Sequence, residues 1–386
     1  MRVAAGTAAE VDRPMPEVGA RAELVFANAR IVRPDEIIRG SLHVIDGMIV
    51  DIGPAATNVP SAIDLGGEYL LPGLIDVHTD NIEKHIIPRP GVLWDGMSAA
   101  AAHDMVLASA GITTVFDSLC VGTLGKPDRR HALPAAIEGL QRAERHGLLR
   151  TNHFLHLRCD VTEPGLAADL APYLENPALR FVTVLEDSAA RDPEHFRFTL
   201  KKRGMTESDV ADTPAETSER RRWLAAECRR RGIPWGNHDD TKAWHVAEGV
   251  ELGMRIAEFP LTREAVEAAH KAGMAIIGGA PNVVAGRSHT KFLSMRELVS
   301  QERVTALCSD YVPASLLHAV LRLTRDPIGL PLSRAVKLVS QAPAELFGLS
   351  DRGTIDVGRR ADLIHVAFDD RAPILRASWH CGQRIV

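Results

Sequence analysis

The order of apolar and polar positions changes its period twice along the chain. Over residues 21–72, short apolar runs such as 24–26 and 29–32 are typical of β-strands. The runs 41–45 and 48–50 are separated only by Asp46 and Gly47, which accept the positive φ angles of a tight turn. We therefore expect a small β unit that includes a hairpin.

From residue 73 to 347, strand-like runs alternate with helical ones. The strand-like runs are 71–77, 112–117, 154–160, 181–187, 233–240, 254–260, 274–282 and 304–310. Helical patterns between and after them include 98–110, 213–231, 262–271, 294–299, 313–324 and 331–347, and we interpret the charged stretch 188–212 as an insertion or long loop. This alternation predicts an α/β fold, with a (β/α)8 TIM barrel over 73–347.

The chain turns β-like again after residue 347, at 353–355 and 361–366. We expect this last stretch to pair with the first one. Residues 21–72 plus 348–386 would then form a composite β-sandwich domain. Residues 1–20 are rich in Ala, Pro and Glu and lack an apolar core segment, which predicts a disordered tail rather than a signal peptide.

Composition excludes several classes of protein. The net charge of −5 gives no basic field for nucleic acid or a membrane surface. No apolar run reaches the roughly 18 residues of a membrane span. Arginine runs at 220–222 and 229–231 lie beside glutamates, so we interpret them as a solvated helix face. Five scattered cysteines without a CxxC motif predict reduced thiols and a cytoplasmic protein.

Polar side chains gather where the predicted strands end. His78 and Asp80 are two residues apart, so on an extended backbone they point to the same side. In a barrel, all strand C-termini open on one face, where active sites are built. The strand-end residues that can bind metal, move a proton or hold an anion are His78, Asp80, Asp117, Asp160, Glu186, Asp187, His238, Asp239, Asp240, Glu258, Asn282 and Asp310.

This combination of residue types points to metal-assisted hydrolysis. Histidine and carboxylate ligands suit zinc, manganese or iron. A bound divalent ion acidifies water, and a neighbouring carboxylate can take the proton. Asp310, after the last strand, is our candidate for both metal ligand and base. His238 is the candidate for the second histidine ligand.

A further set of residues suits an anionic substrate. Arginine, lysine, serine and backbone N–H groups in a glycine-containing loop are the groups that bind phosphate. No GxxxxGK[ST] motif is present, so the chain has no P-loop. The candidate substrate-binding residues are Asn81, Lys84, Arg89, Arg158, Asp239, Glu258, Asn282, Arg287, Ser288 and His289.

Two motifs together resemble the amidohydrolase superfamily: residues 71–78, which read LPGLIDVH, and 353–364, which read GTIDVGRRADLI. Within it, HTDN at 78–81, EFP at 258–260 and GRSH at 286–289 resemble the diphosphatases of phosphonate metabolism in the C–P lyase pathway. The resemblance implies one or two divalent ions and hydrolysis of alpha-D-ribose 1-methylphosphonate 5-triphosphate to the 5-phosphate and pyrophosphate. The implied metal ligands are His78, Asp80, Asp187, His238 and Asp310.

One segment departs from that resemblance. Residues 186–192 read EDSAARD, where the diphosphatases have Asp-His-Thr/Ser-Pro-Gly-Gln. Asp187 is kept and the following histidine is lost, so either Glu186 or Asp187 can approach the metal. A related phosphorylated substrate, a C–N bond hydrolase or deaminase on the same barrel, and an inactive barrel that serves as a scaffold all stay open. The expected partner is a small phosphorylated molecule, and a homo-oligomer is compatible with the sequence.

Overall fold

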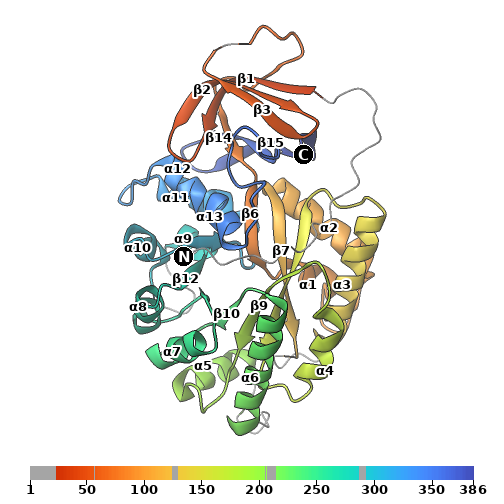
Figure 1. Cartoon of the computed structure of the whole chain (residues 1–386), viewed down its shortest axis with the longest axis vertical. Helices are drawn as coiled ribbons and strands as arrows, with labels where there is room; N and C mark the ends of the chain where they lie inside the picture. Colours follow the sequence, from red (N-terminus) through yellow and green to blue (C-terminus); the bar gives the residue numbers. More distant parts are fainter. Residues whose placement is uncertain (1–22, 56, 124–128, 205, 207–213, 287–292) are drawn as a thin grey trace.

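Two eight-stranded sheets organise the protein in the computed structural model. The structure describes residues 23–386 except 56, 124–128, 205, 207–213 and 287–292. The first sheet is built from both chain ends, and Figure 1 shows these red and blue segments together above the rest of the chain. The tail predicted over 1–20 lies outside the described residues.

The first sheet has the strand order β16-β15-β14-β5-β1-β2-β3, with β4 paired to β1. As predicted, the C-terminal stretch pairs with the segment before the barrel, because β14 runs antiparallel to β5. The predicted hairpin is also present, with Asp46 and Gly47 at φ 49° and 78°. The strands are β1 (Glu23–Val32), β2 (Ile37–Ile45), β3 (Met48–Gly53), β4 (Ile63–Asp64), β5 (Tyr69–Pro72), β14 (Leu363–Phe368), β15 (Pro373–His380) and β16 (Gln383–Arg384).

The second sheet runs in sequence order from β6 to β13, with parallel pairing throughout. A parallel bridge between Thr79 and Asp310 joins the last strand to the first. The predicted (β/α)8 barrel is therefore confirmed. Its strands are β6 (Leu74–Thr79), β7 (Ile112–Val121), β8 (Asn152–Asp160), β9 (Leu179–Leu185), β10 (Trp235–His238), β11 (Ile256–Glu258), β12 (Ala275–Gly279) and β13 (Ala306–Cys308).

Helices surround the barrel sheet (Figure 1). Some of them begin at a side-chain cap: Asp95 accepts from Ser98 N–H at the start of α2, and Thr262 accepts from Ala265 N–H at the start of α8. They are α1 (Asn81–Ile86), α2 (Gly96–Ser109), α3 (Arg129–Arg145), α4 (Leu166–Leu170), α5 (Pro193–Arg203), α6 (Pro214–Arg231), α7 (Ala243–Glu251), α8 (Arg263–Lys271), α9 (Ala280–Ala285), α10 (Met295–Ser300), α11 (Ser315–Leu323), α12 (Leu332–Lys337) and α13 (Gln341–Leu346), with a 3-10 turn at Ala171–Tyr173.

Three local expectations were wrong. The stretch 188–212 is not simply a loop, because Asp192 caps helix α5 and Pro193 starts it. The single helix expected over 331–347 is two helices, α12 and α13. Residues 353–355 form no strand, although Ile355 is buried in the core of the first sheet.

The junction between the two sheets fixes where the barrel begins. Gly73 separates β5 from β6, and a Cβ there would lie 2.3 Å from Thr113 Oγ1, so only glycine fits this approach. At the opposite rim, Asp310 N–H donates to His78 C=O at 3.0 Å and Asp80 N–H donates to Asp310 C=O at 2.8 Å. These bonds hold the polar ends of the first and last strands against each other.

Apolar side chains fill both sides of the barrel wall. Inside it, Phe116, Phe181 and Ile277 belong to one buried cluster. The larger cluster lies between the strands and the helices. Because the interior is packed with side chains, a substrate can reach only the mouth where the polar strand ends lie.

Candidate active site

His78 lies at the centre of the barrel mouth and is almost fully buried. Its Nδ1 is 2.8 Å from Glu258 Oε1, at the end of β11. Its Nε2 is 3.3 Å from Asp80 Oδ1. The two ring nitrogens therefore face different carboxylates, and their surroundings decide which nitrogen carries the proton.

Asp80 and Asp310 complete a group of metal-competent atoms around His78. One ligand atom from each of the three residues lies within 4.8 Å of the others. Arg158, which points inward from β8, contacts Asp80 with Nη2 2.9 Å from Oδ1. The structure thus brings together three of the metal ligands expected from the sequence and one expected substrate-binding cation.

Glu258 faces three histidines at once. Besides His78, its Oε2 is 3.7 Å from His156 Nε2 and 3.8 Å from His238 Nε2. Within the described structure this buried Oε2 has no hydrogen-bond partner. His156, His78 and Glu258 form a second group whose ligand atoms lie within 4.8 Å of one another.

His156 was missed as a candidate ligand because it lies in mid-strand rather than at a strand end. A signal was present in the sequence, since His156 and Arg158 are two apart and so share one face of β8. That face points into the barrel, where the His156 ring stacks on Phe181 with 4.2 Å between ring centroids.

The electrostatics of this cluster favour a cation. Burial lowers the pKa of His78, but Glu258 and Asp80 outweigh burial and raise it to about 10. Burial alone would raise the pKa of Asp80, yet Arg158 and His78 hold it well below its usual range. Burial raises the pKa of Asp310. Carboxylates that raise the pKa of a buried imidazole this far create a negative potential that stabilises a bound cation. Imidazole nitrogen and carboxylate oxygen donors suit zinc, manganese or iron.

Cationic and amide groups line the side of the mouth formed by β6 to β8. Lys84 Nζ donates to Asn81 Oδ1 at 3.2 Å and to the Tyr311 carbonyl at 2.9 Å. Glu83 lies between two arginines, 3.0 Å from Arg129 Nη2 and 4.0 Å from Arg158 Nη2. Arg129, at the start of α3, was not among the residues expected from the sequence.

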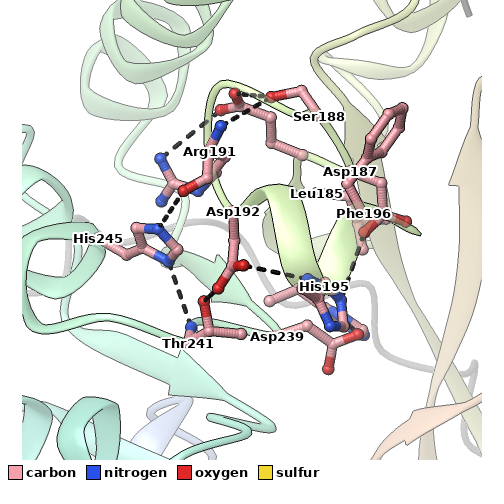
Figure 2. A pocket seen from close by; sticks show the side chains of 12 residues that line it. Leu185, Asp187, Ser188, Arg191, Asp192, His195, Phe196, Asp239, Thr241 and His245 are labelled. Atoms are coloured by element: carbon pink, nitrogen blue, oxygen red, sulfur yellow. Dashed lines mark hydrogen bonds and ion pairs between the residues drawn. The ribbon is translucent and has the colours of Figure 1, made fainter. Parts of the chain in front are cut away.

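A pocket opens on the other side of the mouth, at the ends of β9 and β10. Asp187 contacts His195 of α5, with Oδ1 3.5 Å from Nε2 (Figure 2). Asp239 contacts His238, with Oδ2 3.2 Å from Nδ1. Glu186 and Asp187 both line this pocket together with His238, but Glu186 is paired with Arg221.

The remaining candidates are more scattered. Arg89 is exposed in the loop after α1. Asn282 lies in α9, directly after β12. Arg287, Ser288 and His289 lie outside the described residues.

The arginines of α6 are not all on a solvated face, which corrects the interpretation of the 220–222 run. Arg221 is buried, with Nη2 2.5 Å from Glu186 Oε2 and Nη1 3.1 Å from Asn237 Oδ1. Its partners are 35 and 16 residues away along the chain, so the sequence pattern around Arg221 could not reveal them.

A separate histidine–carboxylate cluster lies beside α2, on the helix-facing side of β7 and β8. Asp117 accepts from two imidazoles, with 2.7 Å to His103 Nε2 and 2.7 Å to His153 Nδ1. His153 Nε2 is 3.2 Å from Asp104 Oδ1. Each carboxylate thus has a buried imidazole partner, and together these residues form an internal ion-pair network.

This network should make stability depend on pH. Burial lowers the pKa of His153, but Asp117 and Asp104 outweigh it and raise the pKa to about 9. The stabilisation is complete below the ordinary value near 6.5 and is lost as pH rises through about 9. Between pH 7 and 10, wild type should therefore lose about 2 kcal/mol more unfolding free energy than His153→Gln, measured by urea denaturation. Equal losses would contradict a charged His153.

None of the helices in the described ranges is both long and apolar enough to cross a membrane. Four of the five cysteines, Cys120, Cys159, Cys228 and Cys308, are buried free thiols.

Comparison with known proteins identifies the family. Residues 205–378 match the model of the Amidohydrolase family. The alpha-D-ribose 1-methylphosphonate 5-triphosphate diphosphatase of Escherichia coli (strain K12) is 35% identical over 377 residues, covering 94% of this chain and 100% of that protein. An imidazolonepropionase of Deinococcus radiodurans is 25% identical and covers 84% of this chain and 86% of its own length.

Solved structures agree on the fold. N-acetylglucosamine-6-phosphate deacetylase from Pasteurella multocida aligns with a TM-score of 0.63 at 14% identity, covering 94% of this chain and 99% of its own. A D-hydantoinase aligns with a TM-score of 0.63 at 16% identity, covering 95% of each chain. At this identity the likeness shows the fold alone. The full-length relative at 35% identity shows more: the chain belongs to the amidohydrolase superfamily and is a hydrolase.

Proposed function

We propose that this protein hydrolyses alpha-D-ribose 1-methylphosphonate 5-triphosphate to the 5-phosphate and pyrophosphate. The observation that carries the proposal is Arg158 Nη2, 2.9 Å from Asp80 inside the His78–Asp80–Asp310 group. A guanidinium beside metal-competent carboxylates suits a substrate that brings phosphate groups to a divalent ion. The E. coli relative, matched over its full length, bears the name of this activity.

The same group would hold the divalent ion. His78, Asp80 and Asp310 offer one nitrogen and two oxygens within 4.8 Å of one another, and His238 and Asp187 are candidates for a second ion. When bound, such an ion lowers the pKa of water and polarises a phosphoryl oxygen. Zinc, manganese and iron all suit these donors.

The protein's own side chains would share three tasks. Asp310, on the rim of the last strand, would take the proton of the attacking water. Arg158 would bind phosphate oxygens once Asp80 is engaged by the cation. Arg129 and Lys84, on the same side of the mouth, would stabilise the pyrophosphate that leaves.

Arg129→Gln should weaken inhibition by the product pyrophosphate about tenfold, because one charged hydrogen bond to a phosphate is lost. The measurement is the inhibition constant of inorganic pyrophosphate in steady-state assays. Arg130→Gln is the matched control, since Arg130 is the neighbouring arginine, more than half exposed and 3.5 Å from Glu163. An equal effect of both variants would remove Arg129 from the site.

Phosphorus NMR tests the function directly. The metal-loaded protein is incubated with alpha-D-ribose 1-methylphosphonate 5-triphosphate, and with ATP as a comparison. Pyrophosphate released from the ribosyl phosphonate and not from ATP supports the proposal. No release by a protein that holds metal would sink it and would point to another phosphorylated substrate or to C–N bond hydrolysis.

A further inference from the structure

A second feature of the mouth is the pocket between α5 and the ends of β9 and β10 (Figure 2), of which the proposal above uses only Asp187 and His238. It is partly open to solvent and includes His238 in its wall. Its lining residues are Leu185, Glu186, Asp187, Ser188, Arg191, Asp192, His195, Phe196, His238, Asp239, Thr241 and His245.

The one arginine among these lining residues is already occupied. Arg191 Nη1 lies 2.7 Å from Glu248 Oε2, and its Nη2 lies 3.4 Å from Asp240 Oδ1. Glu186 is a third carboxylate contact, at 3.6 Å. The other face of the guanidinium lies over the Trp244 ring, 5.2 Å from its centroid. Arg191 is therefore held by the protein and is not presented to a ligand.

The wider network adds no positive charge. Arg221 is bound to Glu186 and lies 3.6 Å from Glu248. Two guanidiniums thus share three carboxylates: Glu186, Asp240 and Glu248. A phosphate entering this pocket would find these cations neutralised and further carboxylates ahead of it, so a polyanion should be disfavoured here.

The rest of the lining suits a ligand that carries hydroxyl groups. The Asp239 carboxylate accepts hydrogen bonds, and the His195 imidazole lies close to it (Figure 2). Carboxylates are regular acceptors for ribose hydroxyls. Leu185 and Phe196 provide an apolar wall for the C–H groups of a ring. A carboxylate acceptor and an imidazole donor beside an apolar wall suit the hydroxyl groups and the C–H face of a sugar ring.

We propose that this pocket binds the sugar ring of the substrate, with Asp239 and His195 as hydroxyl partners. This inference rests on the proposed function, because it assigns the part of that substrate that is not cleaved. The triphosphate then extends past His78 toward Arg158 and Arg129. Helix α5, which supplies His195, becomes the element that sets sugar specificity.

Binding of substrate fragments tests this orientation without turnover. Calorimetric titration of the metal-loaded protein uses ribose 5-phosphate, 2-deoxyribose 5-phosphate, xylose 5-phosphate and inorganic tripolyphosphate. Wild type should bind ribose 5-phosphate about tenfold more tightly than at least one of the two altered sugars, as expected for one lost hydrogen bond to a charged group.

The variants assign that preference to the pocket. His195→Ala should weaken ribose 5-phosphate about tenfold and remove the preference, while tripolyphosphate affinity stays within about twofold. Asp239→Asn, which keeps the side-chain shape, is the second variant and should act in the same direction. Glu194→Ala is the control, because Glu194 is exposed on the same helix and does not line the pocket.

The outcomes separate this inference from the proposed function. Sugar preference lost in His195→Ala supports the pocket assignment even if no pyrophosphate is released by wild type. Turnover of the ribosyl triphosphate without any sugar preference, or without measurable ribose 5-phosphate binding, overturns the pocket assignment alone. Weakened tripolyphosphate binding in His195→Ala would also overturn it, because the pocket would then hold phosphates.

Discussion

Replacing Asp310 by asparagine should lower kcat about a thousandfold and leave the fold intact. Asparagine keeps the size and polarity of the side chain but cannot take a proton, and loss of a positioned base typically costs about 10² to 10⁴ in rate. The backbone bonds of residue 310 to His78 and Asp80 do not involve its side chain, so the rim of the barrel should be preserved. The measurement is steady-state hydrolysis of alpha-D-ribose 1-methylphosphonate 5-triphosphate, with the melting temperature recorded in parallel.

The metal content of the Asp310→Asn variant distinguishes the two roles proposed for Asp310, metal ligand and base. A variant that is inactive but still holds the wild-type amount of metal would identify Asp310 mainly as the base. One that loses both activity and metal would identify it mainly as a ligand, as expected for His78→Ala. Asp35→Asn, at an exposed position in the loop between β1 and β2, is the control and should behave as wild type. A near wild-type rate in Asp310→Asn would rule out either role.

The sequence was enough to predict the architecture because the barrel depends on local patterns. Each strand is a short apolar run, and most of the segments between strands have a helical periodicity, some of them with a cap residue at the start, so the alternation is visible along the sequence. The pairing of β14 with β5 was also predictable, since two β-like stretches flanked the barrel and each needed a partner. Helix α5 was missed although Asp192 and Pro193 marked its start, because Phe196 and Leu200 are its only large buried apolar residues among those described.

The site could be predicted only where its metal-competent side chains lie at the C-terminal ends of strands. His78, Asp80 and Asp310 come together because parallel strands carry their C-termini to one rim. The pairing of Arg221 with Glu186 was hidden, because an arginine in a charged run looks the same whether it faces solvent or a buried carboxylate. Whether such an arginine is exposed or buried depends on where the fold places it, and the residue type alone does not reveal this.

The role of Glu258 was also not predictable from its position in the sequence. Its strand-end position suggested contact with substrate. Its carboxylate instead lies 2.8 Å from His78 Nδ1 and is almost completely buried. We propose that Glu258 accepts the Nδ1 proton of His78, so that in the metal-loaded protein the lone pair of Nε2 is available to an ion shared with Asp80 and Asp310.

Glu258→Gln should therefore weaken divalent metal affinity about 10- to 100-fold, the usual effect of removing a carboxylate that orients a histidine ligand. Glutamine fills the same space and can still contact Nδ1, but without the negative charge His78 Nε2 becomes a weaker donor. The measurement is competition with a chromophoric chelator at fixed pH, which needs no substrate and does not depend on the proposed reaction. Glu251→Gln, at the exposed end of α7, is the matched control.

The result also decides between the two roles for Glu258. Reduced metal affinity, with the KM at saturating metal close to that of wild type, would mean that Glu258 acts through His78. Unchanged metal affinity with a raised KM would mean that Glu258 contacts the substrate, as its strand-end position first indicated. In that case His78 would have to take its orientation from the backbone of β6 and from Asp80, and the buried Oε2 between His156 and His238 would be the atom that the substrate reaches.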